Sequence, residues 1–451
     1  MIDRIESFNT LLNSFVWGAP MMVLLVGTGV LLTIATGLVQ VRYFPRVVRE
    51  VLGKLFKRGS GEGSVTPFQA LSTALASTVG VGNIAGVCTA IFLGGPGALF
   101  WLIISGFVGM ATKFAEVAIA LHYRERDRQG VMRGGAMYVL AKGLKMPLPG
   151  KLFAVLAAAA AFGIGNMVQA NSVADAARSS FGVPVWITGV VLSALTALVV
   201  LGGLKRIAEV TQLLVPFMCV LYIVGATAVL VRFAGQLPHA VALVFESAFS
   251  GHAAAGGFAG ATVMAALRYG IARGLFSNEA GLGSAPMVHA SATTDHPVRQ
   301  ALYGIFEVFV DTMVVCLLTG LVVLVTGAWQ SGDTGAALAG RAFSIGLPGE
   351  AGHFIVSTSI MLFAFSTVVG WSFYGETGIT FLFGTAAVLP YRVFWILFVF
   401  LGSIGRLHLV WSIADTLNGL MAIPNLIGVL CSIALLRRLM REFFRNTKAA
   451  E

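Results

Sequence analysis

Residues 66–92 read TPFQALSTALASTVGVGNIAGVCTAIF. Both ends are apolar enough for a membrane helix, but the middle, TVGVGN at 78–83, is rich in glycine and polar residues. Each glycine weakens a helix by about 1 kcal/mol relative to alanine. Irregular backbone at membrane depth is tolerated only where it is buried in protein or lines a cavity. The stretch therefore predicts a membrane helix interrupted at a binding site, although glycines that only allow close helix packing are the simpler alternative.

A second stretch carries the same kind of interruption. Residues 261–292 read ATVMAALRYGIARGLFSNEAGLGSAPMVHASA, with the break SNEAGLGS at 277–284. The four residues Asn83–Gly86, NIAG, recur as Asn278–Gly281, NEAG. Interrupted helices at matching positions of two halves mark the binding site in inverted-repeat transporters. The coincidence of break and repeat favours a binding site over packing alone.

The composition places most of the chain in lipid. Of the 451 residues, 57% are apolar and only 11% are charged, and the mean hydropathy is +0.86. Soluble domains are about a quarter charged, so a soluble enzyme, a disulfide scaffold and a disordered protein are excluded. A span needs about 20 apolar residues, and the chain predicts an all-α integral membrane protein with about 11 transmembrane helices. The expected spans are 17–41, 66–93, 97–122, 152–174, 184–203, 208–232, 258–292, 300–327, 352–380, 391–405 and 409–436.

The spans group into a five-plus-five inverted repeat. Residues 66–232 form the first repeat and 233–436 the second, each beginning with an interrupted helix. Because five is odd, the two repeats enter the membrane from opposite sides. Residues 1–65 then supply one accessory N-terminal helix with a basic loop, and 437–451 form a basic tail.

Lysine and arginine predict the orientation. If the N-terminus lies outside, the inside loops hold 22 of these residues and the outside segments hold five. Loops on the cytoplasmic side of a membrane are enriched in both residues. We therefore expect a multi-pass protein of the cell membrane, plasma or bacterial inner, with the N-terminus outside and the C-terminus in the cytoplasm. The net charge of +10 follows from this rule and does not indicate nucleic acid.

Several longer motifs resemble those of the alanine or glycine:cation symporters, also called sodium:alanine symporters. The resemblance covers about residues 66–436. It implies the inverted-repeat fold of the leucine transporter class and the co-transport of a small neutral amino acid with a cation, usually sodium. The motifs are FQALSTALASTVGVGNIAGV, GGPGALFW, GMATKFAE, RGLFSNEAGLGSAP, HPVRQ, GWSFYGE and NGLMAIPNL.

The sequence departs from this family in three places. Val81 stands where the family commonly has a hydroxyl residue, and Ala136 replaces a usual proline. The segment GETGI after Tyr374 differs from the family's usual continuation. The change at Val81 bears on the size or affinity of the substrate, so the resemblance leaves the particular amino acid open.

The two breaks offer what a zwitterion needs. Its carboxylate requires donors and its ammonium group acceptors, because an unpaired buried charge costs roughly several kcal/mol. The outer half of the first broken helix starts near Gly82 and Asn83, so its free N–H groups and positive dipole end form an anion site. The first half of the second broken helix is expected to end near Leu275 and Phe276. Its free carbonyls there can accept hydrogen bonds from the amine. The expected contacts are Val79, Gly80, Val81, Gly82 and Asn83 around the carboxylate and Phe276, Ser277 and Asn278 around the amine.

Three further residues are candidates for the pocket. Gln169 is either a substrate contact or part of an interhelical hydrogen bond, and Gly165 leaves room beside it. Trp371 and Phe276 are candidate walls that limit the size of the side chain, although a tryptophan can equally be a packing residue. No charged residue is expected in this pocket, which predicts selectivity against charged amino acids.

The resemblance also implies a sodium site. In the leucine transporter class, one sodium ion bridges carbonyls of the first broken helix and a Thr–Ser pair on a later helix. Hydroxyls that only bond back to carbonyls one turn earlier are the alternative. By this resemblance the ligands are the carbonyls of Ala76, Val79 and Phe363 and the hydroxyls of Ser366 and Thr367.

Ionisable residues inside spans are functional candidates by default. Lys113 and Glu116 are three apart and are expected to neutralise each other. Glu307 and Asp311 lie four apart on one face and need a partner. Arg268 or Arg273 is the expected partner of these two carboxylates. The sequence assigns no role to Glu376 or Asp415.

The leading interpretation is a sodium-coupled symporter of alanine or glycine that works by alternating access. An uncoupled facilitator or channel and a proton-coupled amino-acid transporter are the alternatives. A membrane-embedded enzyme ranks low, because HExxH, Walker A and GxSxG motifs in a supporting context are missing. No cofactor and no use of ATP or nucleic acid are expected; the partners are the amino acid, sodium and the lipid bilayer.

Overall fold

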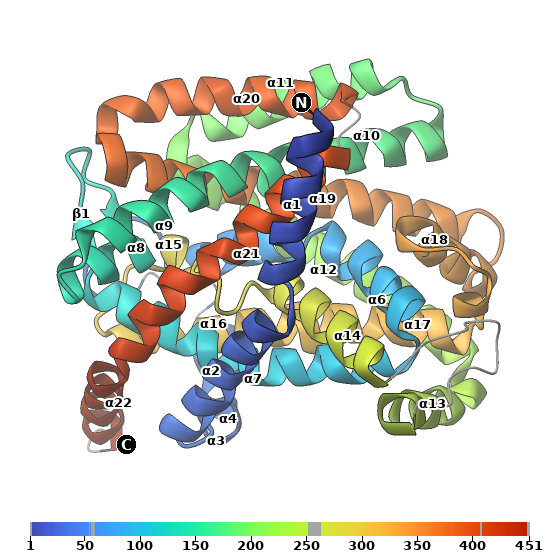
Figure 1. Ribbon diagram of the computed structural model, residues 1–451, viewed down its shortest axis with the longest axis horizontal. Helices are drawn as coiled ribbons and strands as arrows, with labels where there is room; N and C mark the ends of the chain where they lie inside the picture. The colour runs from blue at the N-terminus through green and yellow to red at the C-terminus, as the bar shows by residue number, and fades with distance from the viewer. Residues whose placement is uncertain (1, 54, 56–58, 251–262, 406–407, 449–451) are drawn as a thin grey trace.

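The computed structural model describes residues 2–53, 55, 59–250, 263–405 and 408–448. Helices make up nearly all of it (Figure 1). Among the described residues the only strands are β1 (Glu125–Arg126) and β2 (Met132–Arg133), which pair antiparallel with Glu125 opposite Arg133. An all-α architecture is confirmed.

The helices of the first half end with a long one of 30 residues. They are α1 (Ile2–Val16), α2 (Ala19–Ala35), α3 (Val39–Arg42), α4 (Phe44–Leu52), α5 (Pro67–Thr78), α6 (Val87–Gly94), α7 (Gly97–His122), α8 (Ala136–Tyr138), α9 (Pro147–Ala160), α10 (Val168–Phe181), α11 (Val185–Val200) and α12 (Gly203–Arg232).

The helices of the second half follow a short 3₁₀ turn. They are α13 (Leu237–Ser250), α14 (Val263–Asn278), α15 (Pro286–His289), α16 (Pro297–Val308), α17 (Leu317–Val325), α18 (Gly335–Gly346), α19 (Ala351–Phe383), α20 (Val388–Ile404), α21 (His408–Cys431) and α22 (Ile433–Lys448). Within the described ranges four segments are π-helical: Gly82–Gly86, Val139–Gly143, Ala161–Met167 and Phe309–Cys316.

The described helices do not confirm the number of eleven spans. Eight helices are long and apolar enough to cross a membrane, and a ninth is the bent pair α5 and Gly82–Gly94. Two other expected spans correspond to shorter helices of 16 residues each, α11 and α14. The first residues of the expected span 258–292 lie outside the described residues.

Several surface helices were missed by the sequence analysis, because a search for long apolar runs ignores them. α1 packs along α21, where Asn9 Nδ2 donates to Ser412 Oγ at 2.7 Å and Asn13 Nδ2 donates to Asp415 Oδ2 at 3.0 Å. α21 stops at Cys431, and α22 begins at Ile433 as a separate helix, so the last span does not run to 436 as expected.

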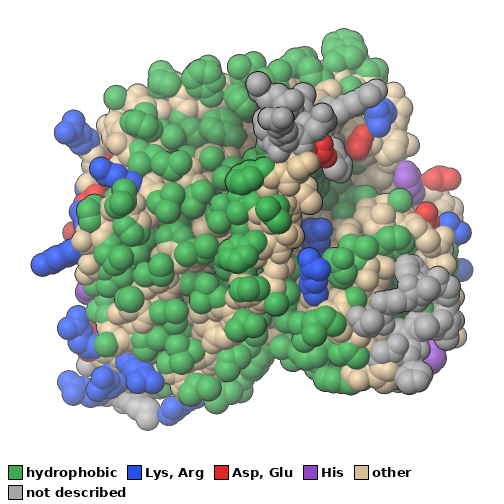
Figure 2. Space-filling model, viewed as in Figure 1, with side chains coloured by type: hydrophobic (Ala, Val, Ile, Leu, Met, Phe, Trp, Pro, Cys, Tyr) green, Lys and Arg blue, Asp and Glu red, His purple; other side chains and the backbone are tan. Residues whose placement is uncertain are grey.

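The surface fits a protein in lipid. Apolar side chains cover the visible face, while Lys and Arg gather along its left edge (Figure 2), where β1, α8 and α22 lie in Figure 1. Leu198 is 71% exposed and Phe217 is 61% exposed. Large apolar side chains facing outward in such number belong against lipid rather than water.

His296 fixes the start of α16. Its Nδ1 accepts a hydrogen bond from the Val298 N–H at 3.1 Å. Burial of the ring, more than any neighbouring charge, lowers the pKa of His296 below its ordinary value. The neutral ring is the form that can accept this bond, so the shift and the cap support each other.

Glu376 joins three elements near the basic edge. Its Oε1 accepts from Arg133 at 2.8 Å and its Oε2 from Arg392 at 2.8 Å. Arg133 also pairs with Asp127 at 2.6 Å. Glu376 and Arg133 are almost fully buried. Glu376, to which the sequence analysis assigned no place, therefore links α19 to α20 and to β2.

We expect Glu376→Gln to lower the free energy of unfolding by about 3–5 kcal/mol, because the buried Arg133 and the partly buried Arg392 would each lose a carboxylate partner. Thermal unfolding of the purified protein in detergent measures the change. Asp175→Asn is the matched control, since the Asp175–Arg178 pair is exposed and such pairs contribute about 0–1 kcal/mol. Equal shifts in Tm for both variants would contradict the role given to Glu376.

Candidate functional site

The first break lies where the sequence predicts it. α5 begins with a capping box, in which Thr66 Oγ1 accepts from the Gln69 N–H at 3.1 Å and Gln69 Oε1 accepts from the Thr66 N–H at 3.0 Å. The helix ends at Thr78, and a new helical run begins at Gly82 after a bend of 52°. Residues 79–81 are thus the interruption.

The second break lies a little later than expected. α14 continues to Asn278, so Phe276 lies in its last turn and not beyond it. Glu279 follows with φ +55°, and Gly281 and Gly283 have φ of +94° and +78°. Glycine adopts such angles without steric cost, which lets the chain turn before α15 begins. The interruption is therefore 279–285.

The asparagines of the repeated motif hold the two breaks in shape. Asn83 Oδ1 accepts from the Gly80 N–H at 2.9 Å, and Asn278 Oδ1 accepts from the Ala280 N–H at 3.0 Å. The side-chain amide of Asn83 donates to Asp311, and that of Asn278 donates to Thr312. Both asparagines are fully buried and use their polar atoms within the protein.

A cavity of about 20 Å³ lies between the two breaks. That volume is about one water-sized sphere. Its lining includes six of the predicted substrate contacts, Gly80, Gly82, Gln169, Phe276, Ser277 and Trp371, and also Ser77, Thr78, Ile164, Glu279, Thr367 and Asn418. The predicted residues Val79, Val81, Asn83, Gly165 and Asn278 lie in or beside this region but do not line the cavity.

Gly165 has a packing role in this structure. A Cβ built on it would lie 2.3 Å from Trp371 Cβ, so the glycine lets α19 approach closely. Trp371 is 1% exposed and forms a wall of the cavity. The glycine thus sets the position of that wall.

Glu279 is a lining residue that sequence reasoning missed. Its Oε1 accepts from Trp371 Nε1 at 3.0 Å, and its Oε2 accepts from the Ser284 hydroxyl. The expectation that no charged residue lines the pocket is therefore wrong. The available signal was the position of Glu279 inside a break at membrane depth, where an ionisable residue is a functional candidate.

The predicted cation ligands come together beside the first break. Ser366 Oγ donates to the Phe363 carbonyl at 2.8 Å and to the Ala76 carbonyl at 3.2 Å. Thr367 Oγ1 donates to the Phe363 carbonyl at 2.9 Å. Val79, the fifth predicted ligand, is the C-cap of α5. Both hydroxyls bond back along α19, and the hydrogen bond from Ser366 to the Ala76 carbonyl also joins α19 to the broken helix.

This group contains only oxygen donors. Carbonyls and hydroxyls suit hard cations, whereas transition metals favour His and Cys. Within the described part of the chain, no group of three His, Cys, Asp or Glu side chains is arranged to hold a metal ion. The chemistry of the donors fits an alkali or alkaline-earth cation.

The buried ion pairs differ from those expected. Lys113 pairs with Glu307 at 3.1 Å and not with Glu116. His289 Nε2 lies 2.9 Å from the other oxygen of Glu307. Arg268 and Arg273 therefore do not neutralise Glu307, because Lys113 on α7 already does.

Asp311 and Glu116 are held by neutral donors. Asp311 accepts from Ser277 at 3.0 Å and from Asn83, so it connects the two breaks from behind. Glu116 accepts from Asn425 and from the Gly281 N–H at 3.1 Å. Asp311 therefore lacks the arginine partner that the sequence analysis proposed, and Glu116 lacks the proposed pairing with Lys113.

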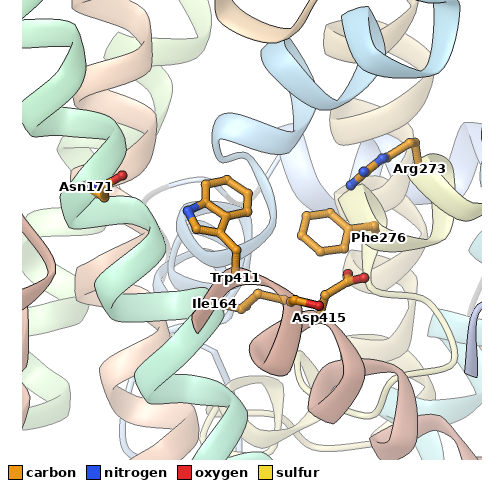
Figure 3. A pocket seen from close by; sticks show the side chains of 7 residues that line it. Ile164, Asn171, Arg273, Phe276, Trp411 and Asp415 are labelled. Carbon is orange, nitrogen blue, oxygen red and sulfur yellow. The ribbon is translucent and has the colours of Figure 1, made fainter. Parts of the chain in front are cut away.

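A larger cavity of about 570 Å³ adjoins the small one. It is lined by Ile164, Asn171, Arg273, Phe276, Trp411, Ser412 and Asp415 (Figure 3). Ile164 and Phe276 line both cavities and therefore mark the boundary between them. Arg268, Arg273 and Asp415 also line a side cavity of about 130 Å³. The large cavity and this side cavity together form a vestibule, which contains Asp415, left without a place in the sequence analysis, and both arginines.

The fold and the site together define a class of membrane protein. Two interrupted helices enclose a polar cavity inside a bundle of membrane-length helices, with a wider vestibule beside it. Helix breaks at the centre of a membrane bundle are the substrate and ion sites of secondary transporters. The protein is therefore a transporter and not an enzyme.

Comparison with known proteins gives the family. The sequence model of the sodium:alanine symporter family matches residues 2–451. The chain therefore belongs to that family. The sodium/alanine symporter AgcS of Methanococcus maripaludis is 48% identical over 437 residues, which cover 95% of each chain. An uncharacterized transporter of Haemophilus influenzae is 44% identical over 98% of this chain and 97% of its own. GlnT of Bacillus subtilis, named a probable sodium/glutamine symporter, is 37% identical over 100% of this chain and 93% of its own.

Solved structures agree on the fold. A mutant form of the manganese transporter of Eremococcus coleocola superposes with a TM-score of 0.51 over 82% of this chain and 78% of that chain. At 14% identity this likeness concerns the fold alone. The protein is thus a multi-pass membrane symporter of amino acids and cations.

Proposed function

We propose that the protein couples the uptake of small neutral amino acids, alanine and glycine, to sodium. The observation that carries this proposal is the oxygen cluster of Ala76, Phe363, Ser366 and Thr367 directly beside the small cavity. Thr367 lines that cavity and also belongs to the cluster. A cation held there and a substrate held in the cavity would stabilise each other through the shared broken helix.

In this proposal the carboxylate binds at the first break. The helical run from Gly82 to Gly94 points its free N–H groups and positive end at the cavity. Val79, Gly80, Val81 and Gly82 supply the backbone there, while Asn83 keeps it in shape. Phe276 and Ser277, at the negative end of α14, face the amine, while Asn278 keeps the second break in shape.

The pocket walls limit the substrate to a small side chain. A Cβ built on Gly82 would already lie 3.5 Å from the Phe276 ring, and Trp371 closes the cavity beside it. In its ionised form Glu279 would disfavour acidic side chains at the cavity, which favours substrates whose side chain carries no negative charge. The name of GlnT indicates that relatives also include a carrier of a larger neutral amino acid.

The orientation and the repeat boundaries belong to the same proposal. With 22 Lys and Arg residues in the loops on one side, the N-terminus lies outside and the C-terminus lies in the cytoplasm. Residues 66–232 and 233–436 are then the two inverted repeats. In this orientation the N-terminal end of α21, which lines the vestibule with Trp411, Ser412 and Asp415, lies toward the outside, so substrate and sodium would enter past Phe276.

A neutral zwitterion that moves with one sodium ion carries one net charge. At 100 mV this supplies about 2.3 kcal/mol, and a tenfold sodium gradient adds about 1.4 kcal/mol, enough for about 500-fold accumulation. We expect labelled alanine to accumulate in proteoliposomes only under an inward sodium gradient, and more strongly with a negative interior. Accumulation that is unchanged when the gradient is imposed would contradict sodium coupling.

Proton coupling is a second candidate because Glu279 lines the cavity and a carboxylate can carry a proton. The same vesicles separate the two ions. An inward proton gradient without sodium would drive uptake only if protons are coupled. Uptake that merely equilibrates under both gradients would indicate a facilitator.

A further inference from the structure

We propose that Asn418 recognises the ammonium group of the bound amino acid together with Gln169, so that α21 takes part in substrate selection. The inference rests on the proposed function and assigns a residue that the sequence analysis did not select. Asn418 lies on α21, is 1% exposed and lines the small cavity. Its Oδ1 is buried and accepts no hydrogen bond in the described part of the protein.

Gln169 has the same property on another helix. It is 6% exposed and lines the same cavity from α10. Its Nε2 donates to the Ile164 carbonyl at 3.0 Å, which fixes the amide group, and its Oε1 is buried without a donor. A Cβ built on Gly80 would lie 3.7 Å from that oxygen, so the oxygen borders the cavity beside Gly80.

Two buried acceptors without partners at one cavity indicate the chemistry of the ligand. Leaving such acceptors unpaired costs free energy that a bound donor recovers. A primary ammonium group has three N–H donors and no acceptor, whereas a carboxylate has only acceptors. The two amide oxygens therefore match the ammonium end of the zwitterion and would repel its carboxylate end.

Glu279 completes the set with charge. It lines the cavity from the second break, and its carboxylate has lone pairs beyond the bonds from Trp371 and Ser284. The ammonium group would then meet three side-chain acceptors from three separate segments. The backbone carbonyls near Phe276 are an addition to this set and not its core.

The test compares two asparagines of the same kind. Asn166 is also fully buried with an unpartnered Oδ1, but it does not line the cavity and its Nδ2 donates to the Trp395 carbonyl at 2.8 Å. Asn418→Leu and Asn166→Leu remove one unpartnered oxygen each at similar side-chain size. Asn418→Asp keeps an acceptor at the site. Thermal unfolding without substrate reports whether each purified variant is folded.

The probes are alanine and N-methylalanine, which has one N–H donor fewer. Loss of a hydrogen bond to a charged group predicts that Asn418→Leu weakens alanine binding about 10- to 100-fold and N-methylalanine binding much less. Asn418→Asp should retain alanine binding, and Asn166→Leu should leave the affinities for both probes within about threefold of the unmodified protein.

Either of two results in Asn418→Leu would overturn the inference while leaving the proposed function intact. These are an unchanged affinity for alanine and an equal weakening of the binding of both probes. An equal loss in Asn166→Leu would also overturn it, because the effect would then come from packing. If Asn418→Leu is unfolded, loss of alanine binding in a folded Asn418→Asp variant decides against it. If the unmodified protein binds neither alanine nor glycine, the proposed function itself is wrong and the inference falls with it.

Discussion

Replacing Gly82 with leucine is expected to abolish alanine binding, with a loss of affinity of about 100-fold or more. The new side chain would start 3.5 Å from the Phe276 ring and extend into a cavity of about 20 Å³. It would also cover the N–H groups at the start of the helical run, which are the proposed carboxylate site. Binding of labelled alanine to the purified, monodisperse variant measures the effect.

Gly86→Leu is the matched control for this change. Gly86 lies four residues further along the same helical run, and a Cβ built on it meets no atom within 4 Å. The same substitution there should leave the alanine affinity nearly unchanged. If Gly82→Leu binds alanine as well as the Gly86 variant does, Gly82 is not at the substrate site.

Thr367→Val is expected to raise the sodium concentration needed for half-maximal alanine uptake about 10- to 100-fold. Valine has nearly the shape of threonine but lacks the hydroxyl oxygen, so the proposed cation would lose one ligand. The hydrogen bond from Thr367 to the Phe363 carbonyl is local to α19, so its loss should change the fold little. Uptake into proteoliposomes over a range of sodium concentrations gives the value.

Thr380→Val separates this effect from a general change in α19. Thr380 also bonds back one turn, to the Glu376 carbonyl at 2.7 Å, but it lies away from the break and the cavity. We expect the sodium concentration for half-maximal alanine uptake by Thr380→Val to equal that of the unmodified protein. A shift of the same size in both variants would mean that back-bonding in α19, and not cation binding, explains the result.

The breaks could be predicted because their cause is local. Glycine and polar residues at 78–83 and 277–284 oppose helix formation wherever the segment lies, and the structure interrupts both helices there. The prediction for the second break was early by a few residues, because α14 keeps Ser277 and Asn278 in its last turn. Helix ends depend on tertiary contacts, and the sequence alone does not fix them.

The direction of each side chain could not be predicted. Asn83 and Asn278 looked like substrate contacts, yet both cap their own breaks. Asn418 lines the cavity although no local pattern separates it from other polar residues, and for Glu279 the only signal was its position inside a break. Lys113 lies three residues from Glu116 but pairs with Glu307, 194 positions away. Such choices depend on which helices pack together, which periodicity within one span does not reveal.

The π-helical segment Ala161–Met167 has a geometric consequence for the site. A π-turn holds one more residue than an α-turn, and one residue of an α-helix corresponds to a rotation of about 100°. If this segment closed into α-helical turns with all its residues kept, all of α10 would turn by about that angle. Gln169 would then leave the cavity, although no lining residue had been altered. The π-helical bonding of this segment, as well as its composition, therefore specifies which side chains meet the substrate.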